Sequence, residues 1–107
     1  MATNSAALIM SIISQIEACD FERLYEIEQQ AHLVPWSLGT LKNNQGERYL
    51  NLKLIENNQI IGFAICQTVL DEATLFNIAI LPTYQGCGLG KLLLNELIVQ
   101  LKEKGVQ

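Results

Sequence analysis

The chain has 107 residues with a formal net charge of −4, and half of its residues are hydrophobic while only 17% are charged. This length suits a single domain over residues 1–107, and the composition excludes a disordered chain. The acidic balance disfavours direct binding to nucleic acid and would suit a basic peptide partner, and no apolar run reaches the roughly 18–20 residues of a membrane span.

The N-terminus and the cysteines indicate a cytoplasmic protein. Residues 1–20 have an apolar centre but no basic residue before it, whereas a secretory signal carries a positive region there. Cys19, Cys66 and Cys87 are odd in number, widely spaced and accompanied by a single histidine. A disulfide framework or a zinc site needs a paired or clustered pattern, so we interpret them as buried thiols and expect no metal.

One strand and two helices are predicted first. Residues 9–14 are apolar and β-branched, which predicts a strand. Asp20 is placed to cap a helix over residues 21–31. The apolar face of that helix is indicated by the helical spacing of Phe21, Leu24, Tyr25 and the pair Ile27–Glu28. Pro35 interrupts the chain, and Ser37 is placed to cap a short helix through about Asn43.

Three antiparallel strands follow. Residues 47–56 alternate between apolar and polar side chains, residues 57–59 have turn chemistry, and residues 60–70 predict the partner strand of a hairpin. A second tight turn at Asp71–Glu72 leads into residues 73–81. Because this run is apolar on both faces, it predicts a central strand. Leucines at helical spacing then predict a helix from Gly88 to about Lys104, with Gly105 as its stop.

The junction LPTYQGCGLGK, residues 81–91, has the pattern of an anion site. Gly86, Gly88 and Gly90 stand at alternate positions, after the last predicted strand and at the start of the last predicted helix. The first turn of a helix has unpaired N–H groups and the positive end of the helix dipole, and glycines let a ligand approach the backbone. The alternative is a tight strand-to-helix turn that binds nothing.

The spacing of this loop excludes two common nucleotide sites. The triphosphate loop needs GxxxxGK followed by Ser or Thr, but here the glycine spacing is one residue short and Leu92 follows Lys91. The dinucleotide fingerprint GxGxxG needs a third glycine where Lys91 stands. The pattern Gln85-x-x-Gly88-x-Gly90 does match the pyrophosphate-binding signature of the GCN5-related N-acetyltransferases, and the order of elements resembles that family.

This resemblance covers nearly the whole chain from about Asp20 onward. Within the family, residues 31–37, 44–49 and 70–90 are similar to bacterial members that acetylate the N-terminal alanine of a small-subunit ribosomal protein. The resemblance implies an acetyl-coenzyme A (acetyl-CoA) dependent N-acetyltransferase without a metal. It also implies the N-terminal portion of an α/β (α+β) fold. In that portion a mixed, mainly antiparallel sheet carries helices on both faces, and the chain ends after the helix that follows the fourth strand.

The resemblance implies the cofactor contacts as well. Backbone groups of the strand before the loop would pair with the pantetheine arm, and N–H groups of the loop would hold the pyrophosphate. The cofactor-binding residues implied are Asn77, Ile78, Ala79, Ile80, Gln85, Gly86, Cys87, Gly88, Leu89, Gly90 and Lys91. Lys91 would add charge near the phosphates or point to solvent. Cys87 is not expected to be a nucleophile, since the family transfers acetyl directly to an amine.

On the peptide side, the resemblance implies the loop between the first two helices, with His32, Pro35 and Trp36 as substrate-binding residues. For Trp36 simple packing is an equal alternative, and for His32 a structural role is the preferred interpretation. Glu47 and Arg48 match the family pattern without an assigned chemical step.

The family's proton-transfer residues are expected outside this sequence. A glutamate on the next strand and a tyrosine on the following helix would lie beyond residue 107, and Glu103 is not taken as a substitute, so the catalytic residues are unknown. We therefore expect a truncated enzyme with weak or absent turnover. The rival hypothesis is a non-catalytic module that binds coenzyme A or a protein, and that forms a homodimer through an open sheet edge.

Overall fold

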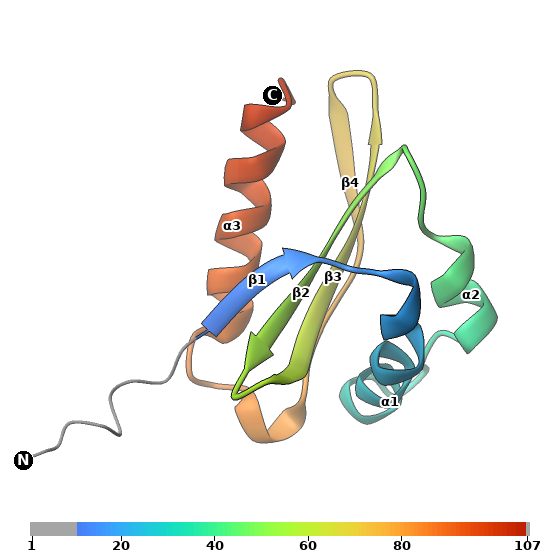
Figure 1. Cartoon of the computed structure of the whole chain (residues 1–107), viewed down its shortest axis with the longest axis vertical. Coiled ribbons are helices and arrows are strands. Elements are labelled where there is room, and N and C mark those ends of the chain that lie inside the picture. Colours follow the sequence, from blue (N-terminus) through green and yellow to red (C-terminus); the bar gives the residue numbers. More distant parts are fainter. Residues whose placement is uncertain (1–10, 107) are drawn as a thin grey trace, which may run out of the picture.

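The described residues form a four-stranded antiparallel sheet with strand order β1-β2-β3-β4 (Figure 1). The structure is a computed structural model that describes residues 11–106. The strands are β1 (Ser11–Gln15), β2 (Tyr49–Glu56), β3 (Gln59–Val69) and β4 (Glu72–Ile80). The helices are α1 (Phe21–Ala31), α2 (Leu38–Asn43) and α3 (Leu89–Glu103), with short 3-10 turns η2 (Ala18–Asp20) and η3 (Pro82–Tyr84).

This order of elements confirms the predicted one, although some boundaries differ. Positions 9 and 10 of the first predicted strand lie outside the described residues, and β1 continues to Gln15. Strand β2 begins at Tyr49, two residues later than predicted. Every strand pairing in the described part of the chain is antiparallel.

Helices α1 and α2 form where the sequence predicts them, but only one of the two predicted caps is made. Ser37 Oγ accepts a hydrogen bond from the Thr40 N–H at 3.1 Å. Asp20 stands at the N-cap of α1 without bonding its first turn. Its carboxylate accepts instead from Lys53 Nζ at 2.6 Å and from the Glu17 N–H at 2.7 Å. The predicted Asp20 cap is therefore wrong, because a buried lysine from β2 competes for the carboxylate.

Both hairpin turns contain residues in the left-handed backbone region. Asn57 and Asn58 have φ of 52° and 65°, a conformation that asparagine tolerates, and they join β2 to β3 as predicted. The second turn is Leu70–Asp71, one residue before the predicted Asp71–Glu72. Leu70 has φ of 57°, which is unfavourable for leucine, so the sequence does not indicate that the turn begins at this residue.

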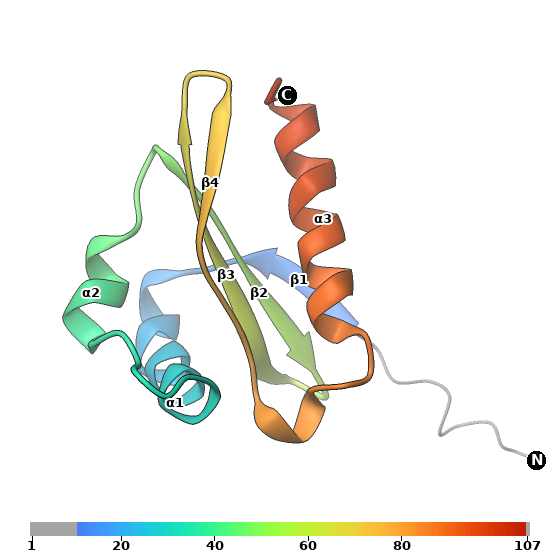
Figure 2. The ribbon, with the colours of Figure 1, turned by 180° about the vertical axis from the view of Figure 1, so that it is seen from behind.

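Among the strands of residues 11–106, β4 lies at an edge of the sheet, which corrects the prediction of a central strand. Figures 1 and 2 show α3 on one side of the sheet and α1 with α2 on the other. Helices α1 and α3 both contact β4. The strand is apolar on both faces for this reason, and its apolar pattern does not require a neighbouring strand on each side.

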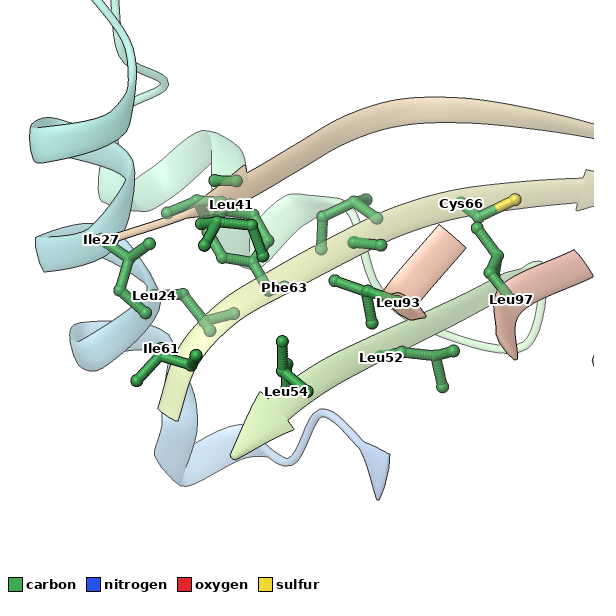
Figure 3. Packing of buried hydrophobic residues seen from close by; sticks show 14 of the residues in the cluster. Leu24, Ile27, Leu41, Leu52, Leu54, Ile61, Phe63, Cys66, Leu93 and Leu97 are labelled. Atoms are coloured by element: carbon green, nitrogen blue, oxygen red, sulfur yellow. The ribbon is translucent and has the colours of Figure 1, made fainter. Parts of the chain in front are cut away.

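The hydrophobic core has one layer on each face of the sheet (Figure 3). One layer joins β3 to the first two helices and includes the fully buried side chains of Leu24, Ile27, Leu41, Ile61 and Phe63. The other joins β2 and β3 to α3 and includes Leu52, Cys66, Leu93 and Leu97. Together the two layers fix α1 and α3 on opposite sides of β4.

Gly62 allows the end of β4 to approach β3 closely. A Cβ atom at this position would lie 2.5 Å from Ile80 Cδ1 and 2.9 Å from the Ala79 carbonyl oxygen. The second of these neighbours is backbone and has little room to move. A glycine on β3 thus sets the position of the residues that lead out of β4.

The cysteines agree only in part with the interpretation as buried thiols. Cys66 is buried, and burial raises the pKa of its thiol. Cys19 and Cys87 are exposed, because they lie in η2 and in the loop before α3. Within residues 11–106, no helix is long and apolar enough to cross a bilayer.

Candidate functional site

The loop between β4 and α3 presents a helix N-terminus without a side-chain cap. Gly86 and Gly88 have φ of 83° and 84°, the left-handed region that favours glycine. Gly88 is the N-cap of α3 and has no side chain to bond the first-turn N–H groups of Leu89, Gly90 and Lys91. Lys91 is exposed beside them. These donors, the helix dipole and the lysine charge together favour an anion at this end of α3.

Gln85 links this loop to the end of β4 by a hydrogen bond. Its side-chain Nε2 donates to the Ile80 carbonyl oxygen at 2.9 Å, and its backbone N–H donates to the Pro82 carbonyl oxygen at 3.2 Å. Both donors are thus used within the protein, whereas the predicted site counts the Gln85 N–H among the pyrophosphate ligands. Cys87 is exposed, and its thiol donates to the Tyr84 carbonyl oxygen at 2.9 Å.

The four predicted strand residues, Asn77 to Ile80, form the C-terminal part of β4. Asn77, Ala79 and Ile80 are buried, and Ile78 is half-buried. Their side chains therefore face the interior, and ligand contact would use the backbone. No strand within residues 11–106 pairs with the outer edge of β4, so this edge has room for an extended ligand.

A recess of about 270 Å³ lies where the loop between α1 and α2 meets β4. It is lined by Glu28, His32, Leu33, Val34, Trp36, Phe76 and Asn77. Two of the three residues predicted on the peptide side, His32 and Trp36, meet here. Pro35, the third, is exposed in the same loop and is not one of the lining residues.

Glu28 is a site residue that the sequence prediction missed. Its side chain is 1% exposed, and it accepts hydrogen bonds from the Trp36 N–H at 2.9 Å and from Asn77 Nδ2 at 3.0 Å. His32 Nε2 lies 3.5 Å from Glu28 Oε1 and 3.1 Å from Asn77 Oδ1. One buried carboxylate thereby joins α1, the loop that follows it and β4.

The sequence did contain a signal for this group. Glu28 stands four residues after Leu24 and seven after Phe21, on the face of α1 that is otherwise apolar. Charged side chains are rarely fully buried unless they are paired, so an acidic residue at such a position indicates partners elsewhere in the fold.

The remaining candidates lie away from this recess. Glu47 and Arg48 are exposed before β2, and the Arg48 carbonyl oxygen accepts from the Thr68 N–H at 2.6 Å. Glu103 is exposed at the end of α3. The described residues contain no cluster of three or more His, Cys, Asp or Glu side chains that could hold a metal ion.

Comparison with known sequences supports a family assignment. Residues 10–107 match the acetyltransferase (GNAT) family. The chain is 95% identical over 98 residues to the [ribosomal protein bS18]-alanine N-acetyltransferase of Haemophilus influenzae, a match that covers 92% of this chain and 67% of that protein. It is 55% identical over 97 residues to the Escherichia coli K12 protein of the same name, covering 91% and 66% respectively. The chain thus spans about two thirds of the length of these relatives.

Solved structures show the same fold. The crystal structure of the ribosomal-protein-S18-alanine N-acetyltransferase from Escherichia coli superposes with a TM-score of 0.89 at 55% identity, covering 91% of this chain and 63% of that one. The PaiA N-acetyltransferase from Thermoplasma acidophilum, solved in complex with coenzyme A, gives a TM-score of 0.80 at 21% identity, covering 91% and 75%. The second likeness concerns the fold alone.

Proposed function

Because the chain belongs to the acetyltransferase (GNAT) family, we propose that it is the cofactor-binding part of an acetyl-CoA-dependent N-acetyltransferase. Its acceptor is the N-terminal alanine of a small-subunit ribosomal protein, and its place of action is the cytoplasm. The main observation in support of the proposal is the N-terminus of α3, which follows Gly86 and Gly88 and has no side-chain cap. The names of the relatives, which refer to alanine acetylation on ribosomal protein bS18, support the choice of acceptor.

The cofactor and the acceptor bind at different places along β4. The N–H groups of residues 86–91 hold the cofactor's pyrophosphate, and the outer edge of β4 along Asn77 to Ile80 pairs with its pantetheine arm. Acetyl-CoA supplies an acetyl thioester when bound. The recess beside His32 and Trp36 receives the acceptor. The attacking amine must be neutral, and its unperturbed pKa of about 8 means that modest help in losing a proton is enough.

Two measurements test the proposal. Isothermal titration should show that the chain binds acetyl-CoA, and Gly88→Val should weaken this binding at least about tenfold, because a β-branched residue resists the left-handed conformation. Mass spectrometry should show acetyl transfer to a peptide that begins with alanine, using this chain extended by the part of the Haemophilus influenzae relative that the match does not cover. Absence of acetyl transfer by a folded, extended protein that binds acetyl-CoA would refute the assigned reaction.

The second candidate function is a non-catalytic module that binds coenzyme A and pairs with a second copy along β4. The free outer edge of β4 among the described strands favours it. Transfer by the extended protein would exclude this alternative. Cofactor binding without transfer, together with a stable dimer, would support it.

A further inference from the structure

Glu28 is a buried negative charge without a permanently charged partner. Both of its carboxylate oxygens accept hydrogen bonds, from the Trp36 N–H and from Asn77 Nδ2, an arrangement that suits a carboxylate because both neighbours are donors. Across residues 11–106, His32 is the only basic side chain within ion-pair distance of it. Burial of a carboxylate is costly unless other charges or dipoles compensate it. A cationic group that entered the recess would supply this compensation.

The same contacts determine which nitrogen of His32 carries the proton. A carboxylate can only accept, so Asn77 must turn its NH₂ group toward Glu28 and its carbonyl oxygen toward His32. An amide oxygen also only accepts, so His32 Nε2 must carry a hydrogen. In the neutral ring, Nδ1 is then the acceptor. The described residues give Nδ1 no hydrogen-bond partner, and the side chain of His32 is 38% exposed where it lines the recess.

We propose that His32 binds the amino group of the acceptor peptide through Nδ1, and that Glu28 is the positioning residue that holds this tautomer. The inference rests on the proposed function, which makes a peptide N-terminus the acceptor. A primary amine or ammonium donates N–H bonds to Nδ1, and its positive form is attracted by the buried Glu28 charge. The recess of about 270 Å³, which Leu33, Val34 and Phe76 also line, has room for a small first residue.

The single histidine of the sequence permits a direct spectroscopic test. Nitrogen-15 spectra of the untagged chain at about pH 8, near the pKa of a peptide amine, report the tautomer of His32 without assignment ambiguity. We expect the form protonated at Nε2. A basic peptide that begins with alanine should then shift the Nδ1 resonance, whereas the same peptide with an acetylated N-terminus should not. A ring protonated at Nδ1, or equal responses to the two peptides, would overturn the proposal.

Variants provide an independent measurement. His32→Gln can still reach Asn77 but lacks an acceptor at the place of Nδ1, and Glu28→Gln removes the charge at nearly constant shape. In the presence of saturating coenzyme A, both should bind the free-amine peptide at least about tenfold more weakly than the wild-type chain. Gln30→Ala, exposed on the same helix, is the matched control and should bind it unchanged.

The melting temperature and acetyl-CoA affinity of each variant separate this inference from the proposed function. A folded His32→Gln chain that binds the free-amine peptide within about twofold of wild type overturns the inference. A wild-type chain that binds the peptide through His32 but does not bind acetyl-CoA would support the inference and refute the proposed function.

Discussion

At the residue scale, Gly88 and Gly90 stand two positions apart at the start of α3 and differ in what the backbone requires of them. Gly88 has φ of 84°, and alanine in this region costs about 1–2 kcal/mol. Gly88→Ala should therefore lower the free energy of unfolding by about that amount. Urea denaturation followed by circular dichroism measures it.

Gly90→Ala is the matched control for this change. Its Cβ would lie 3.7 Å from Ile80 Cγ1, an ordinary contact, and its φ is not in the left-handed region. Because alanine is a better helix former than glycine, we expect unchanged or slightly higher stability, by up to ~1 kcal/mol. Equal destabilisation by both substitutions would contradict a specific backbone requirement at Gly88.

The Asp20–Lys53 pair should make stability depend on acid pH. Burial alone would raise the pKa of Asp20, but hydrogen bonds from Lys53 and from the Glu17 N–H outweigh it and hold that pKa below its ordinary value of 3.8. The folded state then binds this proton less readily than the unfolded chain. The contribution to stability is complete above pH 3.8 and is lost as the pH falls through the folded pKa.

Asp20→Asn tests this dependence. The variant should lose about 2 kcal/mol at neutral pH, because Lys53 loses a charged hydrogen bond, and should show a flatter decline of stability in acid. Glu26→Gln, which removes the exposed carboxylate paired with Arg23, is the control and should keep the wild-type pH profile. Parallel acid profiles for wild type and Asp20→Asn would rule out this pair as the source.

At this scale, the role of a residue could be predicted from the sequence only where its hydrogen-bond partners are near neighbours in the chain. Ser37 caps its own helix and could be predicted from a few neighbours. Asp20 satisfied the same local rule, but its carboxylate bonds Lys53, thirty-three residues away. For Glu28, the sequence indicates only that an acidic residue lies on the apolar face of a helix. Its partners on β4 and in the following loop could not be inferred without the fold.

At the element scale, the contact between β3 and β4 should depend on Gly62. Gly62→Ala would force a Cβ to within 2.9 Å of a backbone oxygen of β4, so the strands must separate locally. We expect a loss of about 1–3 kcal/mol in unfolding free energy, the usual cost of overpacking a core. Thermal and urea unfolding measure this loss.

Gly39→Ala is the control for the change at Gly62. It lies in α2, and its Cβ would approach only Ser37 Oγ, at 3.9 Å. This variant should be neutral or more stable, since alanine favours the helix. A Gly62→Ala protein as stable as wild type would mean that the end of β4 can move without cost.

The helices and strands themselves could be predicted from the periodicity of the sequence, whereas the elements that pack or pair with each of them could not. The apolar pattern of β4 reflects the helices α1 and α3, which contact the strand, and it carries no information on whether a strand pairs with each of its edges. The turn at Leu70–Asp71 was misplaced by one residue because Leu70 adopts a conformation that its residue type disfavours. Strand register, set by pairing with β3, decided the position of this turn.

At the scale of the whole molecule, the outer edge of β4 is the surface on which we predict association. No described strand pairs with it, and Leu75 and Phe76 on this strand are 41% and 40% exposed. Unpaired backbone beside apolar side chains favours pairing with a second copy. We therefore predict that the chain self-associates in a concentration-dependent manner, measured by sedimentation velocity over roughly a hundredfold concentration range.

Leu75→Lys should weaken this association, because a charged side chain on an edge strand opposes pairing. The control is Leu70→Lys at the hairpin tip, which removes an even more exposed leucine without altering the edge of β4. If exposed apolar area alone caused association, Leu70→Lys would reduce it at least as strongly. An effect confined to Leu75→Lys would place the contact along β4, where the predicted cofactor arm would also bind.

Acetyl-CoA should then shift the wild-type chain toward the monomer, and a dimer insensitive to acetyl-CoA would show that the two surfaces are separate.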